Sequence, residues 1–302
     1  MADPSPTLSA PVRLDAQALA HIGRRLQAAD EMPWLHAEAA RRMAERLVLV
    51  RQPPERVLDW SLDGGGMSPA LRQALPRAQF VRLVPGHGEA SPAPSWWSRL
   101  KGAAVRAPSL LALDAVEPGA HDLVWSCMAL HFENDPPALF RRWREALRAD
   151  GFVMFSTLGP GSLSGLRELY AQQSWGPAHA PFVDMHDLGD MMVEAGFAGP
   201  VMDQEVLTLT YAEPQSLLRD LRAWGRNLAP QRFPGCRTPR WRDSLLQALG
   251  ARRDASGRIQ LALELVHGHA FRAPDRGPAV APVTTVALSA MKLMLRKSGS
   301  GN

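Results

Sequence analysis

Lysine, cysteine and tyrosine are scarce in this chain of 302 residues. Lysine occurs only at Lys101, Lys292 and Lys297, so nearly all of the positive charge is carried by arginine, and the formal net charge is only +4 at pH 7. The chain also has no lysine-rich run and no RNP-like signature. This weakly basic pattern argues against nucleic acid as a partner.

The two cysteines, Cys127 and Cys236, have no nearby His or Cys at the spacing of a metal site, which predicts no bound metal. Cys127 falls in an apolar run, so two reduced thiols in a cytoplasmic protein is the preferred interpretation. The first residues, MADPSPTLSAP, have no apolar core like that of a signal peptide. No apolar run reaches the length of a membrane span, and we expect no membrane partner.

Hydrophobic residues make up 46% of the chain and charged residues 21%, which is typical of a globular protein. Helical spacing of apolar residues before Pro53 is interrupted at Pro33, which predicts two helices there. We expect an N-terminal tail with helices over 1–53, a main domain over 54–272, and a linker with a terminal helix over 273–302.

Short apolar strands alternate with helices through the main domain. Strands are predicted at 56–60, 80–84, 110–113, 122–127, 152–158, 201–211 and 258–270, and helices at 69–75, 138–148, 163–172 and 186–195, with a terminal helix at 284–296. This alternation predicts an α/β fold with a doubly wound parallel sheet covered by helices on both faces.

Ligands of doubly wound sheets bind beyond the carboxyl ends of the strands, which directs attention to three segments. Gly64, Gly65 and Gly66 follow the first strand and would let a ligand approach the backbone, although an empty tight turn is an alternative. Asp59 ends the first strand and Asp114 follows the third. Carboxylates accept hydrogen bonds from ribose hydroxyls, so the pair favours a nucleoside ligand over simple helix caps.

Longer stretches carry a family resemblance over about Arg24 to Ala273. They are DLVWSCMALHFENDPPALFRRWREALRADGFVMFSTLGPGSL, FVDMHDLGDMMVEAGFAGPVMDQEVLTLTY, EPQSLLRDLRAWGRN and LALELVHGHAF. The chain resembles class I S-adenosylmethionine methyltransferases, and in detail the malonyl-acyl-carrier-protein O-methyltransferases of biotin synthesis. The first stretch occurs in many methyltransferases, whereas FVDMHDLGD and GHAF are more particular to this family.

The resemblance implies a Rossmann-like sheet of seven strands with the last one antiparallel, and lid helices inserted at about 213–257. It implies S-adenosyl-L-methionine as cofactor. The implied cofactor-binding residues are Asp59, Gly64, Gly65, Asp114, Ala115, Leu130 and His131. The chain departs from the family loop Asp-x-Gly-x-Gly-x-Gly, because Ser61 and Asp63 stand at its first two glycines. The acid expected after the second strand is also missing, since Pro85 follows Val84.

Methyl transfer to a carboxylate needs no general base near neutral pH, so no catalytic residue is assigned. Arg222 is the candidate for orienting the acceptor carboxylate, because a guanidinium matches its geometry. His186, Asp187 and His269 are candidates to line the acceptor site, with a purely structural role as the alternative for each histidine.

Seven arginines cluster late in the chain, at Arg219, Arg222, Arg226, Arg232, Arg237, Arg240 and Arg242. They are either a solvated helical face or a docking surface for an acidic acyl carrier protein. The main hypothesis is a monomeric enzyme that methylates the free carboxylate of a malonyl thioester. The alternatives are an inactive relative whose cofactor pocket is filled by Trp60, Asp63 or Val84, and a methyltransferase for another small acceptor.

Overall fold

The structure, a computed structural model, describes residues 13–48, 50–62, 68–83, 109–111 and 115–274. Two helices come first, α1 (Ala16–Gln27) and α2 (Trp34–Leu47). They are followed by β1 (Arg56–Asp59), α3 (Pro69–Ala74), β2 (Gln79–Leu83) and β3 (Ser109–Leu111). The break between α1 and α2 confirms the prediction at Pro33, which precedes the first residue of α2. The predicted terminal helix at 284–296 lies outside the described residues.

The second half of the chain continues the alternation of strands and helices. Its elements are β4 (His121–Cys127), the short 3-10 helix η2 (Leu130–Phe132), α5 (Pro136–Ala146), β5 (Leu147–Leu158), α6 (Ser164–Gln172), α7 (Met185–Glu194), β6 (Phe197–Tyr211), α8 (Pro214–Trp224), α9 (Pro239–Gly250) and β7 (Ile259–Arg272). Helix α5 ends two residues before the predicted Arg148 because Leu147 already pairs with His121 in the sheet.

The strands form one sheet in the order β3-β2-β1-β4-β5-β7-β6. The β1, β2, β3, β4 and β5 strands pair in parallel, whereas β7 is antiparallel to both β5 and β6. The strand order reverses between β1 and β4, which is where a doubly wound sheet opens a crevice for a ligand. The α/β doubly wound fold class is confirmed.

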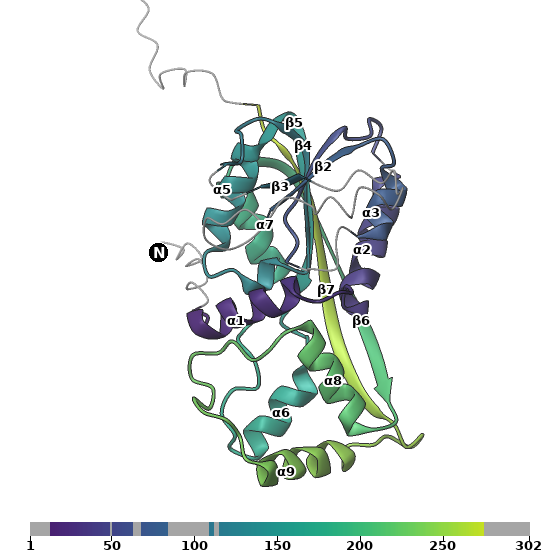
Figure 1. Cartoon of the computed structure of the whole chain (residues 1–302), viewed down its shortest axis with the longest axis vertical. Helices are drawn as coiled ribbons and strands as arrows, with labels where there is room; N and C mark the ends of the chain where they lie inside the picture. Colours follow the sequence, from purple (N-terminus) through teal and green to yellow (C-terminus); the bar gives the residue numbers. More distant parts are fainter. Residues whose placement is uncertain (1–12, 49, 63–67, 84–108, 112–114, 275–302) are drawn as a thin grey trace, which may run out of the picture.

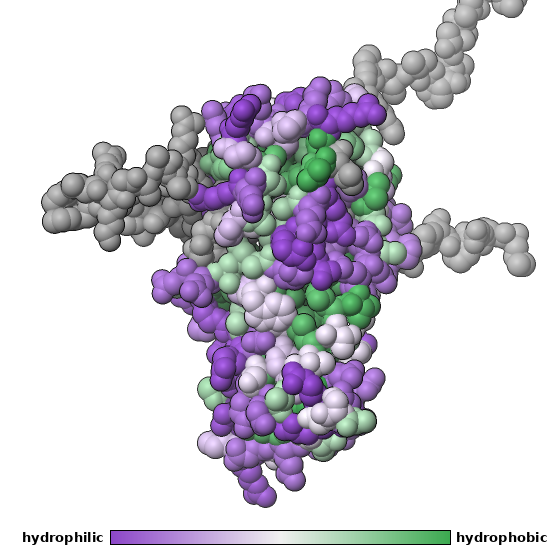
Figure 2. Space-filling model, turned by 90° about the vertical axis from the view of Figure 1, so that its right-hand side faces the viewer, coloured by the Kyte–Doolittle hydropathy of each residue, from purple (hydrophilic) through white to green (hydrophobic). Residues whose placement is uncertain are grey.

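Helices cover both faces of the sheet (Figure 1). On one face α2 and α3 bury residues such as Met43 and Leu71 against Val57 and Trp125. On the other face α5 and α7 bury Trp143 and Met192 among Leu58, Val124, Phe155 and other apolar residues. The side of the molecule shown in Figure 2 is largely hydrophilic. Charged side chains on α2 and β6 form ion pairs with each other, for example Arg46 with Asp203.

The β6–β7 hairpin extends past the rest of the sheet. Leu158, the last residue of β5, pairs with Leu265, so residues 260–264 of β7 pair only with β6. Helices α6, α8 and α9 pack around this overhang in the lower part of the molecule (Figure 1) and bury Leu261 and Leu263 with Leu217 and Leu245. The segment predicted as a lid therefore sits on the projecting hairpin, next to the carboxyl ends of the parallel strands.

Candidate functional site

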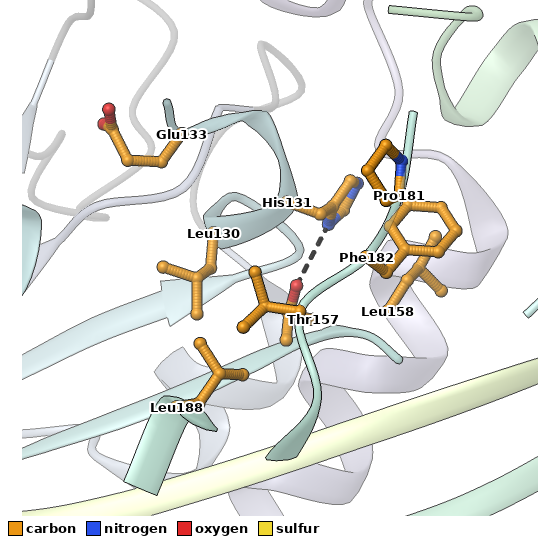
Figure 3. A pocket seen from close by; sticks show the side chains of 9 residues that line it. Leu130, His131, Glu133, Thr157, Leu158, Pro181, Phe182 and Leu188 are labelled. Carbon is orange, nitrogen blue, oxygen red and sulfur yellow. Dashed lines mark hydrogen bonds between the residues drawn. The ribbon is translucent and has the colours of Figure 1, made fainter. Parts of the chain in front are cut away.

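A pocket opens just beyond the carboxyl ends of β4 and β5 (Figure 3). Its walls come from the turn after β4, the end of β5, the loop before α7 and α7 itself. They comprise Leu130, His131, Glu133, Thr157, Leu158, Pro181, Phe182, Val183 and Leu188. Leu130 and His131 were predicted to lie here, and the structure places both at the pocket. The lining is mainly apolar with a few polar groups, as in most small-molecule sites.

His131 is the central polar side chain of this pocket. Its Nδ1 lies 3.4 Å from the Thr157 Oγ1, within hydrogen-bond reach, and its ring packs against Phe132 with ring centroids 4.2 Å apart. Burial, reinforced by the charge of nearby His36, lowers the pKa of His131 to about 3. The imidazole is therefore neutral near pH 7, and the site presents no positive charge from this side chain.

Asp59 occupies the carboxyl end of β1, beside β4, and its side chain is almost fully buried. The Asp59 Oδ1 accepts a hydrogen bond from the Ser61 backbone N–H at 3.1 Å. Its Oδ2 lies 3.9 Å from the Arg82 Nε at the end of β2. The predicted carboxylate thus lies at the switch point, where it contacts Arg82 of the neighbouring β2 and Ser61 just after β1.

The other predicted cofactor residues either lie next to a gap in the described residues or fall within one. Ala115 is exposed, and Gly64, Gly65 and Asp114 lie outside the described residues. Two of the side chains proposed to fill the pocket in an inactive relative, Asp63 and Val84, lie outside as well. The third, Trp60, packs edge-on against Trp143 of α5, with ring centroids 6.2 Å apart, and does not line the pocket.

Helix α1 packs against residues that neighbour the pocket lining. Its buried Ile22 and Leu26 pack in one cluster with Phe132, Ala180 and Leu228. Asp15 caps α1 by accepting a hydrogen bond from the Ala18 N–H, and it also accepts one from the Arg232 Nη1 at 2.6 Å. The same helix thus touches the turn after β4, the loop before α7 and the loop between α8 and α9 (Figure 1).

The predicted acceptor residues do not gather at the pocket. His186 is the second residue of α7, has 80% of its side chain exposed and contacts Asp184. Asp187 follows it on α7, and Arg222 is exposed on α8. His269 pairs with Met154, which lies four residues before the end of β5. Burial and the charge of Arg46 on α2 lower the pKa of His269. The roles of these four residues stay predictions.

The arginine cluster divides into internal and exposed members. Arg232 binds Asp15, and Arg237 stacks over the rings of Phe233 and Trp241 while donating to the Trp175 carbonyl. The remaining five, Arg219, Arg222, Arg226, Arg240 and Arg242, are exposed. They lie on α8, on α9 and directly after α8, so the surface of the lid keeps most of the positive charge that the sequence placed there.

Two absences bear on the site. Among the described ranges there is no group of histidine, cysteine, aspartate and glutamate side chains that could hold a metal ion. No helix within those same ranges is long and apolar enough to cross a membrane. Cys127 is buried and Cys236 exposed, and no disulfide joins them.

Sequence reasoning missed several residues of this pocket, namely Thr157, Phe182 and Leu188. Phe182 stacks on His179 and meets the His131 ring edge-on. Phe182 and Leu188 both lie within the FVDMHDLGD stretch, so the sequence motif that could have identified them was already noted. The histidine of that stretch drew attention, whereas its apolar residues are the ones that reach the pocket.

Comparisons with known proteins agree with this geometry. A methyltransferase domain family matches residues 34–199, more than half of the chain. The malonyl-(acyl-carrier protein) O-methyltransferase of Laribacter hongkongensis is 37% identical over 254 residues, which cover 82% of this chain and 86% of that protein. Its counterpart in Gallionella capsiferriformans is 36% identical over 262 residues, with coverage of 84% and 90%.

Among solved structures, the YcgJ protein of Bacillus subtilis superposes with a TM-score of 0.50 at 14% sequence identity. The superposition covers 78% of this chain and 99% of that one. At this level of identity the likeness supports the fold alone.

Proposed function

The chain belongs to the S-adenosylmethionine-dependent methyltransferases, in the family of the malonyl-(acyl-carrier protein) O-methyltransferases, and from this premise we propose its reaction and acceptor. It transfers a methyl group to the free carboxylate of a malonyl thioester on an acyl carrier protein. In biotin synthesis, this methyl ester would hide the charge of the carboxylate while the chain is extended toward the pimelate moiety. The observation that carries the proposal is the identity of 37% and 36% to two such enzymes across most of the chain.

The described residues fit S-adenosylmethionine. A buried carboxylate, Asp59, ends β1 at the switch point, and Leu130 and His131 line an apolar pocket after β4. Asp59 supplies an acceptor for the polar groups of the cofactor, and Leu130 supplies apolar contact. When bound, the cofactor supplies an activated methyl group on a positively charged sulfur. The neutral His131 adds no repulsion to that charge.

The protein has little covalent chemistry to perform in this reaction. The malonyl carboxylate is ionised near pH 7 and is already the nucleophile, so no side chain has to remove a proton. The residues around the pocket act by holding the acceptor in line and by excluding water. Pro181, Phe182 and Leu188 form an apolar wall suited to that exclusion. Arg222 remains the proposed partner of the acceptor carboxylate, and it would have to approach from the lid.

The partner proposed for the exposed arginines of the lid is an acidic acyl carrier protein. Five exposed arginines on and beside α8 and α9 give the lid a positively charged surface. Clustered charge of one sign raises the rate at which an oppositely charged protein meets the site. We also propose that the protein acts as a monomer in the cytoplasm, where the carrier protein would be available.

The first test is isothermal titration of the purified protein with S-adenosylmethionine and with S-adenosylhomocysteine. We expect binding in about the micromolar range, a common range for cofactor-sized ligands. The Asp114→Ala variant should bind more weakly, because it lacks the carboxylate proposed to hold the adenine. Malonyl-acyl carrier protein is then offered with S-adenosylmethionine, and the methyl ester is detected by mass spectrometry.

The outcomes separate the main proposal from its alternatives. Absence of heat and of thermal stabilisation at millimolar ligand would contradict the enzyme and favour an inactive relative. Binding without methylation of malonyl-carrier protein would keep the methyltransferase and reject this acceptor. Trp60 packs against Trp143 of α5 and does not line the pocket after β4.

A further inference from the structure

Buried polar side chains link the carboxyl ends of three neighbouring strands, β2, β1 and β4. Arg82 Nε on β2 lies 3.9 Å from the Asp59 Oδ2 on β1. The Asp59 Oδ1 accepts from the Ser61 N–H at 3.1 Å, and the Ser61 Oγ accepts from the Cys127 N–H at 3.2 Å. The contacts form one continuous chain from Arg82 to the end of β4.

The register of the sheet explains why these side chains meet. Asp59 and Arg82 are direct partners in the parallel pairing of β1 and β2. Because side chains alternate between the faces of a strand, Asp59 shares a face with Val57, and Arg82 shares one with Phe80. Val57 and Phe80 both pack in the core on the α2 and α3 side. The two charges therefore sit on the same face of the sheet, with only 3% and 9% of their side chains exposed.

Ser61 gives this chain a contact that glycine cannot make. The Trp60 N–H donates to the Trp125 carbonyl at 2.7 Å, which continues the pairing of β1 with β4 beyond the strand. The Ser61 hydroxyl then adds one more connection, to the backbone of Cys127. The serine stands where the family loop has its first glycine, and it is 5% exposed.

We propose that Arg82 and Ser61 are positioning residues of the cofactor site, which hold the Asp59 side chain in place at the end of β1, before the glycine-rich loop. This inference rests on the proposed function, because it assigns the two residues to the binding of its cofactor. A buried carboxylate is stable only when paired and hydrogen-bonded, and Arg82 and Ser61 supply these partners.

The test measures the affinity for S-adenosylhomocysteine by titration calorimetry in three variants. Arg82→Leu removes the Arg82 guanidinium beside Asp59, and we expect affinity to fall by about tenfold or more. Ser61→Gly restores the glycine of the family loop, and we expect a loss of about threefold to tenfold, the worth of one hydrogen bond. Arg82→Lys retains the charge and should recover part of the affinity that Arg82→Leu loses.

Arg148→Leu is the matched control. Arg148 donates to Asp122, which lies at the opposite, amino-terminal ends of β1 and β4 and also accepts from the N–H groups of Glu55 and Arg56. This variant also loses the arginine of an arginine–aspartate ion pair in the same sheet, between β5 and β4, yet it should bind the ligand like the unaltered protein. Circular dichroism and thermal melting of all variants report whether they fold.

The results distinguish this inference from the proposed function. If the unaltered protein binds no ligand, the proposed function and this inference both fail. If the unaltered protein binds, and Ser61→Gly and Arg82→Leu bind equally well, the proposed function stands and the inference fails. If Arg82→Leu does not fold, the affinity of Ser61→Gly decides the question. A serine that positions the site makes this variant bind more weakly, whereas a serine without such a role leaves its affinity unchanged or higher.

Discussion

At the residue scale, His131 combines burial, a hydrogen-bond partner and a place in the pocket. Its pKa of about 3 in the folded protein compares with about 6.5 in an unfolded chain. The unfolded chain therefore takes up a proton first as the pH falls from about 6.5 to about 3. The contribution of neutral His131 to stability is complete above pH 6.5 and is lost progressively through that window.

The His131→Gln variant should remove this pH dependence. We expect the difference in the free energy of unfolding between the unaltered protein and the variant to shrink between pH 7 and pH 5. Urea denaturation at the two pH values measures it. Burial also lowers the pKa of other histidines, namely His121, His179, His267 and His269, but these are present in both proteins and cancel. A constant difference across the two pH values would contradict the shift assigned to His131.

A single site residue could be predicted when the sequence around it carried a recognisable pattern. Asp59 ends β1, and a parallel sheet brings strand ends together. Leu130 and His131 lie shortly after β4 and were predicted from the family resemblance. Arg82 carried a signal that was overlooked, because a charged residue inside an apolar strand requires a partner. The contact of His131 with Thr157 could not be predicted, since it depends on how the turn after β4 packs against the end of β5.

At the element scale, the pairing of β5 with β7 requires a glycine at position 268. Gly268 pairs with Phe155 on one side and Met202 on the other. A Cβ at Gly268 would lie 2.4 Å from the Phe155 Cζ and 2.9 Å from the Met202 Sδ. Phe155 is fully buried and has little room to move. This close approach gives a physical reason for the glycine in the GHAF stretch.

Gly268→Ala should destabilise the protein by about 1–3 kcal/mol, the usual cost of overpacking a core. Gly189→Ala on α7 is the matched control, because the nearest atom to its added methyl group, the Met202 Cγ, lies at an ordinary 3.6 Å. Alanine also favours helix over glycine, so the control should unfold at the same urea concentration or a higher one. Equal unfolding of both variants would show that the sheet yields at Gly268 without cost.

The elements themselves were largely predictable because each carries a periodic pattern of apolar residues. The main errors lie at boundaries where pairing decides the outcome. Strand β6 begins at Phe197, four residues before the predicted start, because Phe197 and Ala198 already pair with β7. Gly196 ends α7 as predicted, and its backbone adopts a φ of 89°. A sequence window does not contain the partner strand, so it cannot place such ends.

At the scale of the whole molecule, the fold unites parts that the sequence keeps far apart. Helix α1 meets the loop between α8 and α9 through Asp15 and Arg232. Helix α2 meets α8 where the Trp34 Nε1 donates to Asp220, which also accepts from the Tyr211 hydroxyl. The lid is thus tied to both N-terminal helices. No local pattern predicts these contacts, which arise only once the β6–β7 hairpin has carried the lid past the end of the sheet.

The exposed arginines of the lid can be tested as the docking surface for an acidic acyl carrier protein. Arg219 and Arg226 are exposed on and beside α8, and neither is needed for the proposed orientation of the acceptor carboxylate. The double variant Arg219→Glu/Arg226→Glu should lower kcat/KM for malonyl-acyl carrier protein by about tenfold at low salt, because it reverses two charges that attract an acidic partner. The KM for S-adenosylmethionine should stay unchanged.

Arg141→Glu/Arg142→Glu on α5 is the matched control, since it changes the net charge equally at two exposed arginines away from the lid. Raising the salt concentration should reduce the gap between the lid variant and the unaltered protein, because salt screens exposed charges. A small malonyl thioester without a carrier protein separates docking from chemistry, and its methylation should be equal in the lid variant and the unaltered protein. If the lid and α5 variants lose the same activity toward the carrier protein, net charge alone is responsible and the lid is not the docking surface.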